Sequence, residues 1–278
     1  MSTRFNYLLN KIIDTPLKTS PFEFLYIENF FSDDDFEEIV NDQQINQPVY
    51  KTNVDMINGV LKAGYKPVPF PGCTTDVHEY LSQIESNKKI KYHNDDILEG
   101  FGMSMRMQSY HSHTLQHLMH FLNTEEFKKV CMNKFGKTGA VTIETAIQKY
   151  LTGYEISPHP DIRKKCLTYM VNINPHKDES LGTHFMKFKD DKKLIQDYWE
   201  NTPTVDRCWV PWDWCETEFK QEKNNSITMF APSNNTIHAV KLDYDHKQYQ
   251  RTQIYGNTWY KNARNLTREN WKVLKNLL

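Results

Sequence analysis

Residues 150–161 read YLTGYEISPHPD, and the last three of them, His159, Pro160 and Asp161, decide how the chain is interpreted. The stretch has the composition of a strand, and side chains two positions apart on an extended backbone point the same way. The imidazole of His159 and the carboxylate of Asp161 can therefore reach one common point. Pro160 between them has no N–H to donate, which suits the end or the edge of a strand.

A second histidine can join this pair. His238 follows an expected strand at 226–230 after a tight turn, and antiparallel pairing would bring it beside the first two side chains. Two imidazoles and one carboxylate on one face of a metal form the facial triad of non-haem Fe(II) oxygenases, which leaves other coordination positions open. A His-x-Asp triplet alone is weak evidence, because two solvated turn residues give the same pattern.

Arg251 adds a second feature of a binding site. It lies in the strand-like run RTQIYGNTWY that follows His238 in the chain. A guanidinium binds a carboxylate through two parallel charge-assisted hydrogen bonds, and burying it inside a strand is costly without an anionic partner. We therefore expect an acidic ligand near Arg251, unless this arginine is exposed on its strand.

Around these residues the sequence predicts a run of short strands. Segments of β-type composition are separated by turn residues at Gly153, 174–175, Gly182 and 232–235. The expected strands are 141–150, 153–158, 166–173, 182–188, 226–231, 236–242 and 251–260. Many short strands flanked by helices indicate an α+β fold whose core is a double-stranded β-helix, or jelly roll, with N-terminal and C-terminal helices beside it.

The N-terminal part is expected to supply supporting helices. Residues 22–30 look like a strand, and Ser32 before three aspartates is an N-cap with acids in the first turn of a helix that ends near residue 41. Other helices are expected at 76–85, behind a loop at 66–72, at 113–131, and at 267–277 with Thr267 as its cap. We expect one domain, 1–278, with helical support over about 1–140 and the jelly-roll core over about 141–260.

Composition narrows the classes of function. With 34 basic and 35 acidic residues the formal charge is -1, so no overall attraction to nucleic acid or anionic lipid is visible. No apolar run suits a signal peptide or a membrane span, and the five cysteines form no C-x-x-C pair. We expect a cytoplasmic chain with no nucleic-acid or membrane partner and with a solvated basic run at 163–165. The oligomeric state stays open.

In their order, these features resemble the core of the prolyl-4-hydroxylase-like branch of the 2-oxoglutarate/Fe(II)-dependent dioxygenase superfamily. The resemblance covers residues 148–260. It rests on Tyr150, the Gly153-Tyr154 pair, His159-x-Asp161, the strand at 166–174, the segments 182–188 and 226–232, His238 and Arg251.

The resemblance implies a catalytic metal site in which His159, Asp161 and His238 bind Fe(II), and Arg251 holds the C5 carboxylate of the co-substrate 2-oxoglutarate. Tyr150 resembles a tyrosine that hydrogen-bonds this co-substrate, and Asn172 falls where some relatives place a tyrosine for the same role. The implied enzyme is a dioxygenase that consumes O2, with ascorbate as a candidate reductant. It would hydroxylate an unactivated C–H bond of a peptide, a prolyl one included, an amino acid or a small metabolite.

Hydroxylation is expected over chlorination, because related halogenases have a small residue at the place of Asp161. Two alternatives stay open: a non-catalytic jelly-roll module that binds a metal or a sugar, and a metal enzyme that works without 2-oxoglutarate and so without Arg251.

Two other segments have competing interpretations. The resemblance implies that the insert 190–223, with its aromatic run at 209–215, is a substrate lid, although large aromatic side chains also pack in long loops. The histidines His111, His113, His117 and His120 include helical spacings, but they lack the H-E-x-x-H motif of metalloproteases, so we interpret them as solvated or capping residues.

Overall fold

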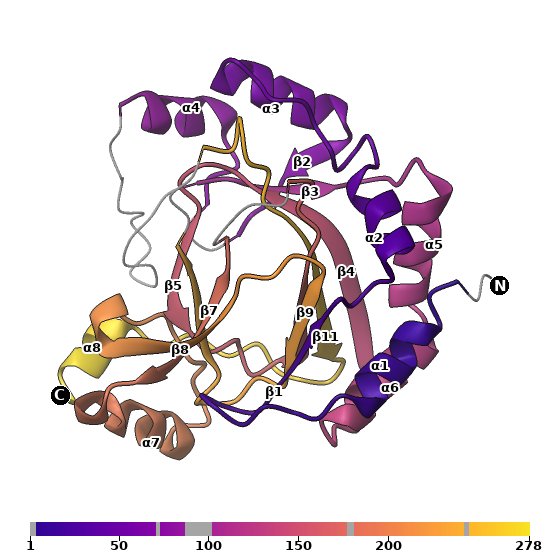
Figure 1. Ribbon diagram of the computed structural model, residues 1–278. Helices are drawn as coiled ribbons and strands as arrows, with labels where there is room; N and C mark the ends of the chain where they lie inside the picture. The colour runs from indigo at the N-terminus through magenta and orange to yellow at the C-terminus, as the bar shows by residue number, and fades with distance from the viewer. Residues whose placement is uncertain (1–3, 71–72, 87–101, 177–180, 242–244) are drawn as a thin grey trace.

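The computed structural model describes residues 4–70, 73–86, 102–176, 181–241 and 245–278. Within these residues, two antiparallel sheets form the two layers of a jelly roll, and helices lie outside it (Figure 1). In the described part of the chain, the larger sheet has the order β1-β9-β6-β11-β4-β3-β2 and the smaller one the order β5-β10-β7-β8. The α+β jelly-roll class expected from the sequence is confirmed.

The strands follow the segments expected from the sequence. The larger sheet contains β1 (Phe24–Glu28), β9 (Ser226–Phe230), β6 (Lys165–Asn172), β11 (Thr252–Tyr260), β4 (Val141–Tyr150), β3 (Ser104–Met107) and β2 (Tyr65–Pro67). The smaller sheet contains β5 (Glu155–His159), β10 (Ile237–Lys241), β7 (Thr183–Phe188) and β8 (Cys215–Gln221). Every strand expected between 141 and 260 is present. Residue 242, at the end of one of them, lies outside the described residues.

Strand β6 shows how alternation divides the core. Leu167, Tyr169 and Val171 belong to the apolar cluster that the helices and the larger sheet share. Met170, on the other face, packs with aromatic residues of both sheets. Every residue of β6 is buried, because helices cover one side of the strand and the second sheet covers the other. The space between the two sheets is therefore left to the side chains of the second face.

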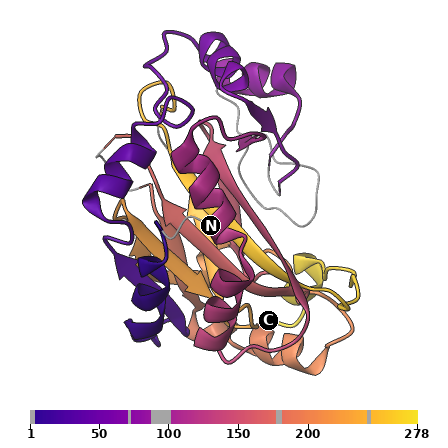
Figure 2. The same ribbon diagram turned by 90° about the vertical axis from the view of Figure 1, so that its right-hand side faces the viewer.

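The helices cover the larger sheet and the ends of the fold. Figures 1 and 2 show α1 (Tyr7–Asp14), α2 (Asp33–Val40), α5 (His113–Leu122) and α6 (Glu125–Lys134) on the outer face of the larger sheet. At the β2 edge lie α3 (Asn53–Lys62) and α4 (Val77–Glu85), and beside the smaller sheet lie α7 (Leu194–Asn201) and α8 (Trp271–Lys275). None of the helices in the described ranges has the length and apolar character needed to cross a membrane.

The helix expected at 113–131 is in fact two helices. The hydroxyl of Thr124 accepts a hydrogen bond from the backbone N–H of Phe127 and caps the start of α6. The apolar spacing runs on through the break, because α5 and α6 both bury one face, and this spacing concealed the end of α5 at Leu122. The expected loop at 66–72 is also shorter, since β2 takes its first two residues and 71–72 lie outside the described part.

The last helix begins later than expected. Asn270, and not Thr267, is the N-cap of α8, and its side chain accepts from the backbone N–H of Lys272. The carbonyl of Thr267 instead accepts from the backbone N–H of Asp206 at 2.8 Å. This segment therefore pairs with a distant part of the chain and does not begin a helix.

The insert 190–223 contains structure that the sequence analysis missed. Helix α7 buries Trp199, and β8 pairs with β7 at the edge of the smaller sheet. The sequence of β8, CETEFKQ, presents charged side chains to solvent. Charged side chains protect an edge strand from pairing with other chains, but they also remove the apolar pattern that announces a strand.

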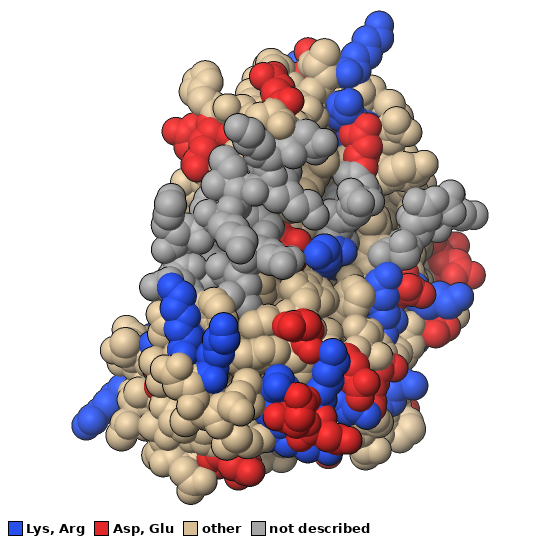
Figure 3. All heavy atoms as spheres, turned by 90° about the vertical axis from the view of Figure 1, so that its left-hand side faces the viewer, with Lys and Arg blue, Asp and Glu red and all other residues tan. Residues whose placement is uncertain are grey.

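The surface carries charges of both signs. On the face that Figure 3 shows, Lys and Arg side chains lie beside Asp and Glu side chains, and neither sign forms a continuous patch. This mixing is in line with the formal charge of -1.

Candidate metal centre

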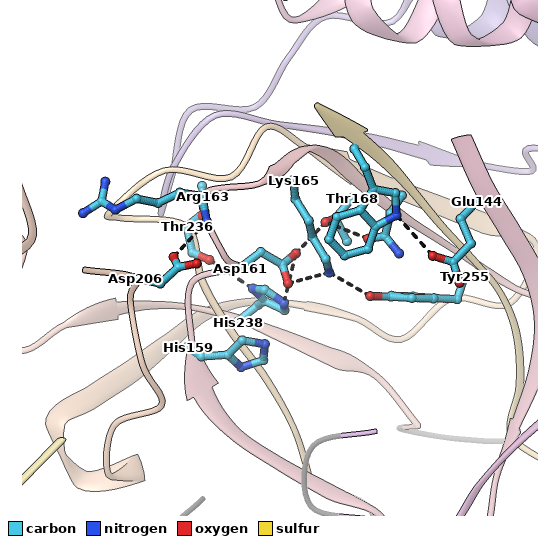
Figure 4. A network of polar contacts seen from close by, with 12 residues as sticks. Glu144, His159, Asp161, Arg163, Lys165, Thr168, Asp206, Thr236, His238 and Tyr255 are labelled. Atoms are coloured by element: carbon cyan, nitrogen blue, oxygen red, sulfur yellow. Dashed lines mark hydrogen bonds and ion pairs between the residues drawn. The ribbon is translucent and has the colours of Figure 1, made fainter. Parts of the chain in front are cut away.

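The smaller sheet brings the three expected metal ligands together. His159 is the last residue of β5, and His238 in β10 is its partner in the antiparallel register. The centroids of the two imidazole rings are 4.3 Å apart. Asp161, two positions beyond His159, places Oδ2 at 4.0 Å from Nε2 of His238. Figure 4 shows the three side chains pointing toward one another.

The three donor atoms can reach one ion. One ligand atom from each of His159, Asp161 and His238 lies within 4.8 Å of the others. Donors that bind one ion at about 2.0–2.2 Å from adjacent positions are about 3 Å apart, so the three side chains have to move closer together when an ion binds. Within the described part of the chain, no other three His, Cys, Asp or Glu side chains come this close.

Backbone carbonyls orient both imidazoles. Nδ1 of His159 lies 2.8 Å from the carbonyl oxygen of Ser157, and Nδ1 of His238 lies 3.0 Å from that of Thr236. Because a carbonyl oxygen can only accept, each Nδ1 carries the proton and donates it. Each Nε2 is then left with its lone pair, which is how partners of this kind prepare a histidine to bind a metal.

The charges of the triad also suit a metal. Burial lowers the pKa of His238, and burial together with the neighbouring His238 lowers the pKa of His159 well below its ordinary value. Burial alone would raise the pKa of Asp161, but Lys165 and the two histidines outweigh it and hold that pKa well below its ordinary value. At neutral pH the site therefore offers two neutral nitrogens and one carboxylate, which is the donor set of a facial triad.

Two residues that the sequence analysis missed hold Asp161 in place. Nζ of Lys165 donates to Oδ1 of Asp161 at 2.6 Å and to the hydroxyl of Tyr255 at 2.8 Å, and the hydroxyl of Thr168 donates to Oδ2 (Figure 4). Lys165 is 8% exposed, so the expectation of a solvated basic run is wrong for this residue. A lysine beside two other basic residues gives no sign in the sequence of its buried partner.

The triad lines a cavity of about 360 Å³ between the sheets. This volume falls within the range of roughly 300–1,000 Å³ that is usual for small-molecule sites. Arg251 and Tyr150, two of the residues expected to bind the co-substrate, line the same cavity. The structure therefore brings the metal triad and the expected anion-binding arginine into one site.

Arg251 is fully buried just before β11. Its Nε donates to the carbonyl of Leu181 at 2.8 Å, and Nη2 donates to the hydroxyl of Thr183 at 3.3 Å. The guanidinium carbon lies 4.7 Å from the ring centroid of Tyr150, and Gln148 donates to the hydroxyl of that tyrosine at 3.1 Å. These contacts fix the guanidinium in the cavity wall.

Asn172 lies behind the residues that line the cavity. It is not among the described residues that line the cavity. Its Nδ2 donates to the carbonyls of Gln221 and Lys223 at 3.3 and 3.1 Å, and its Oδ1 accepts from Nε2 of Gln253 at 2.7 Å. Gln253 does line the cavity. In this geometry Asn172 reaches the cavity through Gln253, which the sequence analysis missed.

The other histidine group is dispersed. His113, His117 and His120 belong to α5, and the ring centroids of His113 and His117 are 6.3 Å apart. Among the described residues, these histidines form no group of three ligand atoms close enough to hold one ion.

The insert contributes part of the cavity wall. Trp209 lines the cavity, and its ring centroid lies 5.7 Å from that of His159. Trp199 and Trp214 instead pack in an apolar cluster with α8 and the smaller sheet. The segment is therefore in part packing and in part wall of the site.

No family model matches the chain, and no curated protein matches its sequence. Among solved structures, the chain is similar to a prolyl-4-hydroxylase from Pseudomonas putida, with 6% identity and a TM-score of 0.43 over 93% of this chain and 100% of that one. HygX from Streptomyces hygroscopicus, with nickel and 2-oxoglutarate bound, shares 7% identity at a TM-score of 0.40 over 99% of each chain. An oxidoreductase of the 2OG-Fe(II) oxygenase family from Burkholderia pseudomallei shares 10% identity at 0.36, over 79% of this chain and 97% of that one.

Two of these structures are described as a prolyl-4-hydroxylase and as a member of the 2OG-Fe(II) oxygenase family. At identities of 6 to 10% the likeness concerns the fold, and the chemistry has to come from the side chains of this chain.

Proposed function

We propose that the chain is an Fe(II)- and 2-oxoglutarate-dependent oxygenase that hydroxylates an unactivated C–H bond. The observation that carries this proposal is the convergence of His159, Asp161 and His238 in the cavity that Arg251 also lines. Bound Fe(II), with 2-oxoglutarate and O2, would supply the oxidising power, and the protein binds, orients and shields the reactants.

Each residue has a defined part in this proposal. His159 and His238 offer Nε2 and Asp161 a carboxylate oxygen, which leaves the remaining coordination positions to the co-substrate and O2. Arg251 binds the distal carboxylate of 2-oxoglutarate with its guanidinium fork, and the ring of Tyr150 supports that guanidinium. The carboxylate of Asp161 takes the place that halogenases leave to a halide, which favours hydroxylation.

Apolar side chains keep water from the centre. Trp209, Ile156 and Met170 line the cavity beside the triad, and all three are buried. An apolar lining that excludes water limits side reactions at an oxidising centre. The substrate is a peptide, a prolyl one included, an amino acid or a small metabolite that fits the remaining space.

The test is turnover of the co-substrate without a prime substrate. We expect the purified protein, given Fe(II), ascorbate, 2-oxoglutarate and O2, to form succinate slowly. Asp161→Ala should abolish both succinate formation and binding of Co(II), used as a spectroscopic stand-in for Fe(II). Asp190→Ala, at an exposed carboxylate, is the matched control and should change neither.

The alternatives give different results in the same experiment. Tight Co(II) binding without any succinate would favour the non-catalytic metal-binding module. Neither metal binding nor succinate in the wild-type protein would contradict the oxygenase altogether.

A further inference from the structure

Arg207 is a buried arginine that forms no ion pair with a carboxylate of the described residues. It is 4% exposed and lines the same cavity as the metal triad. Nη1 donates to the side-chain oxygen of Asn234 at 3.3 Å, and among the described residues Nε has no partner. No carboxylate within the described ranges lies within 4.0 Å of its guanidinium nitrogens.

The nearest acids, Asp206 and Asp161, attract the guanidinium of Arg207 without forming an ion pair with it. Oδ1 of Asp206 accepts from the backbone N–H groups of Arg163 and Arg207, at 2.9 and 3.0 Å. Asp161 is paired with Lys165. Burial, and then the like charge of Arg163, lowers the pKa of Arg207 to about 10, so the guanidinium still carries its proton at neutral pH.

A buried charge of this kind is costly unless a ligand compensates it. Three other basic residues of the cavity have assigned partners. Arg106 pairs with Glu144 at 2.6 Å, and Lys165 pairs with Asp161. In the proposed function, Arg251 binds the carboxylate of the co-substrate. Arg207 is left for a second anion.

The C-terminal segment brings another arginine to the same place. The backbone N–H of Asp206 donates to the carbonyl of Thr267 at 2.8 Å, and that of Glu269 donates to the carbonyl of Asp206 at 2.9 Å. Between these two contacts, Arg268 places its guanidinium carbon 3.7 Å from the ring centroid of Trp209. The guanidinium of Arg268 thus adjoins the indole that packs against the metal ligand His159, and Arg207 lines the same cavity.

We propose that Arg207, with Arg268 beside it, binds a carboxylate or phosphate group of the substrate, so that the substrate is an acid distinct from 2-oxoglutarate. This inference rests on the proposed function for its place beside a metal centre. A guanidinium offers a planar fork that matches either oxyanion. The bound acid would lie next to Trp209 and so within reach of the triad.

The experiment measures binding without turnover. Wild-type protein is loaded with Co(II) and saturated with 2-oxoglutarate, so that Arg251 is occupied. Inorganic phosphate, acetate and the neutral analogue acetamide are then titrated, with tryptophan fluorescence and the thermal unfolding midpoint as readouts. We expect phosphate or acetate to change the fluorescence and raise the midpoint, and acetamide to do neither.

Variants locate the site. Arg207→Met should weaken binding of the responding anion at least tenfold, while its unfolding midpoint without anion stays equal to that of the wild type or rises, because an uncompensated buried charge has been removed. Arg207→Lys keeps the charge but loses the fork, and it should fold and bind the anion more weakly than the wild type. The control is Arg264→Met, at an exposed arginine, and it should behave as the wild type.

Several results would overturn the inference. The first is a wild-type protein that responds to neither anion, and the second is an Arg207→Met variant that responds as the wild type does. Loss of folding in both Arg207 variants would assign the residue a structural role instead. A wild-type protein that binds the anion at Arg207 but forms no succinate would contradict the proposed oxygenase and leave the anion site standing.

Discussion

The carboxylate of Asp161 has little freedom to rotate, because both of its oxygens accept hydrogen bonds. Lys165 donates to Oδ1 and Thr168 donates to Oδ2. A ligand that is already held in place loses less conformational freedom when the ion binds. Such partners of metal ligands typically account for 10–100-fold in metal affinity or activity.

Thr168→Val tests this contribution. Valine keeps the shape of the side chain and removes the hydroxyl, so we expect the dissociation constant for Co(II) to rise about 10–100-fold. Absorbance titration of the protein with Co(II) measures it. Thr142→Val makes the same change at an exposed position of β4 and should have no effect. Equal affinities in the two variants would show that Thr168 does not position the carboxylate.

Arg251→Met tests binding of the co-substrate separately from binding of the metal. Loss of charge-assisted hydrogen bonds worth about 1.5–3 kcal/mol each should raise the dissociation constant of 2-oxoglutarate by at least about tenfold, while Co(II) affinity stays unchanged. Isothermal titration of the Co(II)-loaded protein checks both. Unaltered 2-oxoglutarate binding would place that co-substrate elsewhere. Unaltered activity would point to metal chemistry that does not use it.

For single residues, the sequence predicts those site residues that belong to a recognisable motif. It does not predict those whose role depends on burial in the folded protein. His159 and Asp161 share a strand end, and His238 follows a strand, so their convergence could be expected. Lys165 and Arg207 are ordinary basic residues in the sequence. Only the tertiary structure shows that both are buried beside the site, because burial depends on which distant segments cover them.

Strand β11 lies at the centre of the larger sheet, between β4 and β6, and Gly256 leaves room in it for an aromatic ring. Tyr169 of β6 is opposite Gly256 in the register. A Cβ atom at position 256 would overlap the ring of Tyr169. That ring packs against Phe127, with centroids 5.6 Å apart, and its hydroxyl bonds to Thr145. A glycine here is a packing requirement of the sheet and the helix above it.

Gly256→Ala should therefore destabilise the protein. Overpacking of a filled core costs about 1–3 kcal/mol, and denaturant unfolding of the variant should show a loss of that size. The loss should be much smaller when Tyr169 is also replaced by alanine, because the clash partner is gone. An equal loss in both backgrounds would mean that the ring is not the obstacle.

Elements whose signal is local could be predicted, and those that depend on partners could not. The alternating strand β6 and the capped helix α2 appear at the expected places. Edge strand β8 shows exposed charges and no apolar pattern. The segment around Thr267 has a capping residue, but its backbone pairs with Asp206, and this long-range contact overrides the local signal.

Across the whole molecule, Lys149 ties the N-terminal part to the sheet. It is fully buried in β4, and Nζ donates to the carbonyl of Ile45 at 2.6 Å, to Thr252 at 2.9 Å and to Gln250 at 3.2 Å. All three partners are neutral. Burial lowers the pKa of Lys149 from 10.5 to about 7, so at moderately alkaline pH we expect folding to release its proton and leave a neutral amine that donates two of these three hydrogen bonds.

The consequence is a pH dependence that one substitution should remove. Between pH 7 and 10.5 the unfolded chain holds the proton of Lys149 and the folded chain releases it, so a rise in pH favours folding. Below pH 7 both states hold the proton, and the effect is constant. The free energy of unfolding of the wild type, minus that of Lys149→Met, should therefore increase from pH 7 to 9, by at most about 1.4 kcal/mol per pH unit. Urea unfolding at several pH values measures this difference, with Lys51→Met, at an exposed lysine, as the control that should show no slope. A flat difference for Lys149→Met would mean that the buried ammonium keeps its proton in the folded protein.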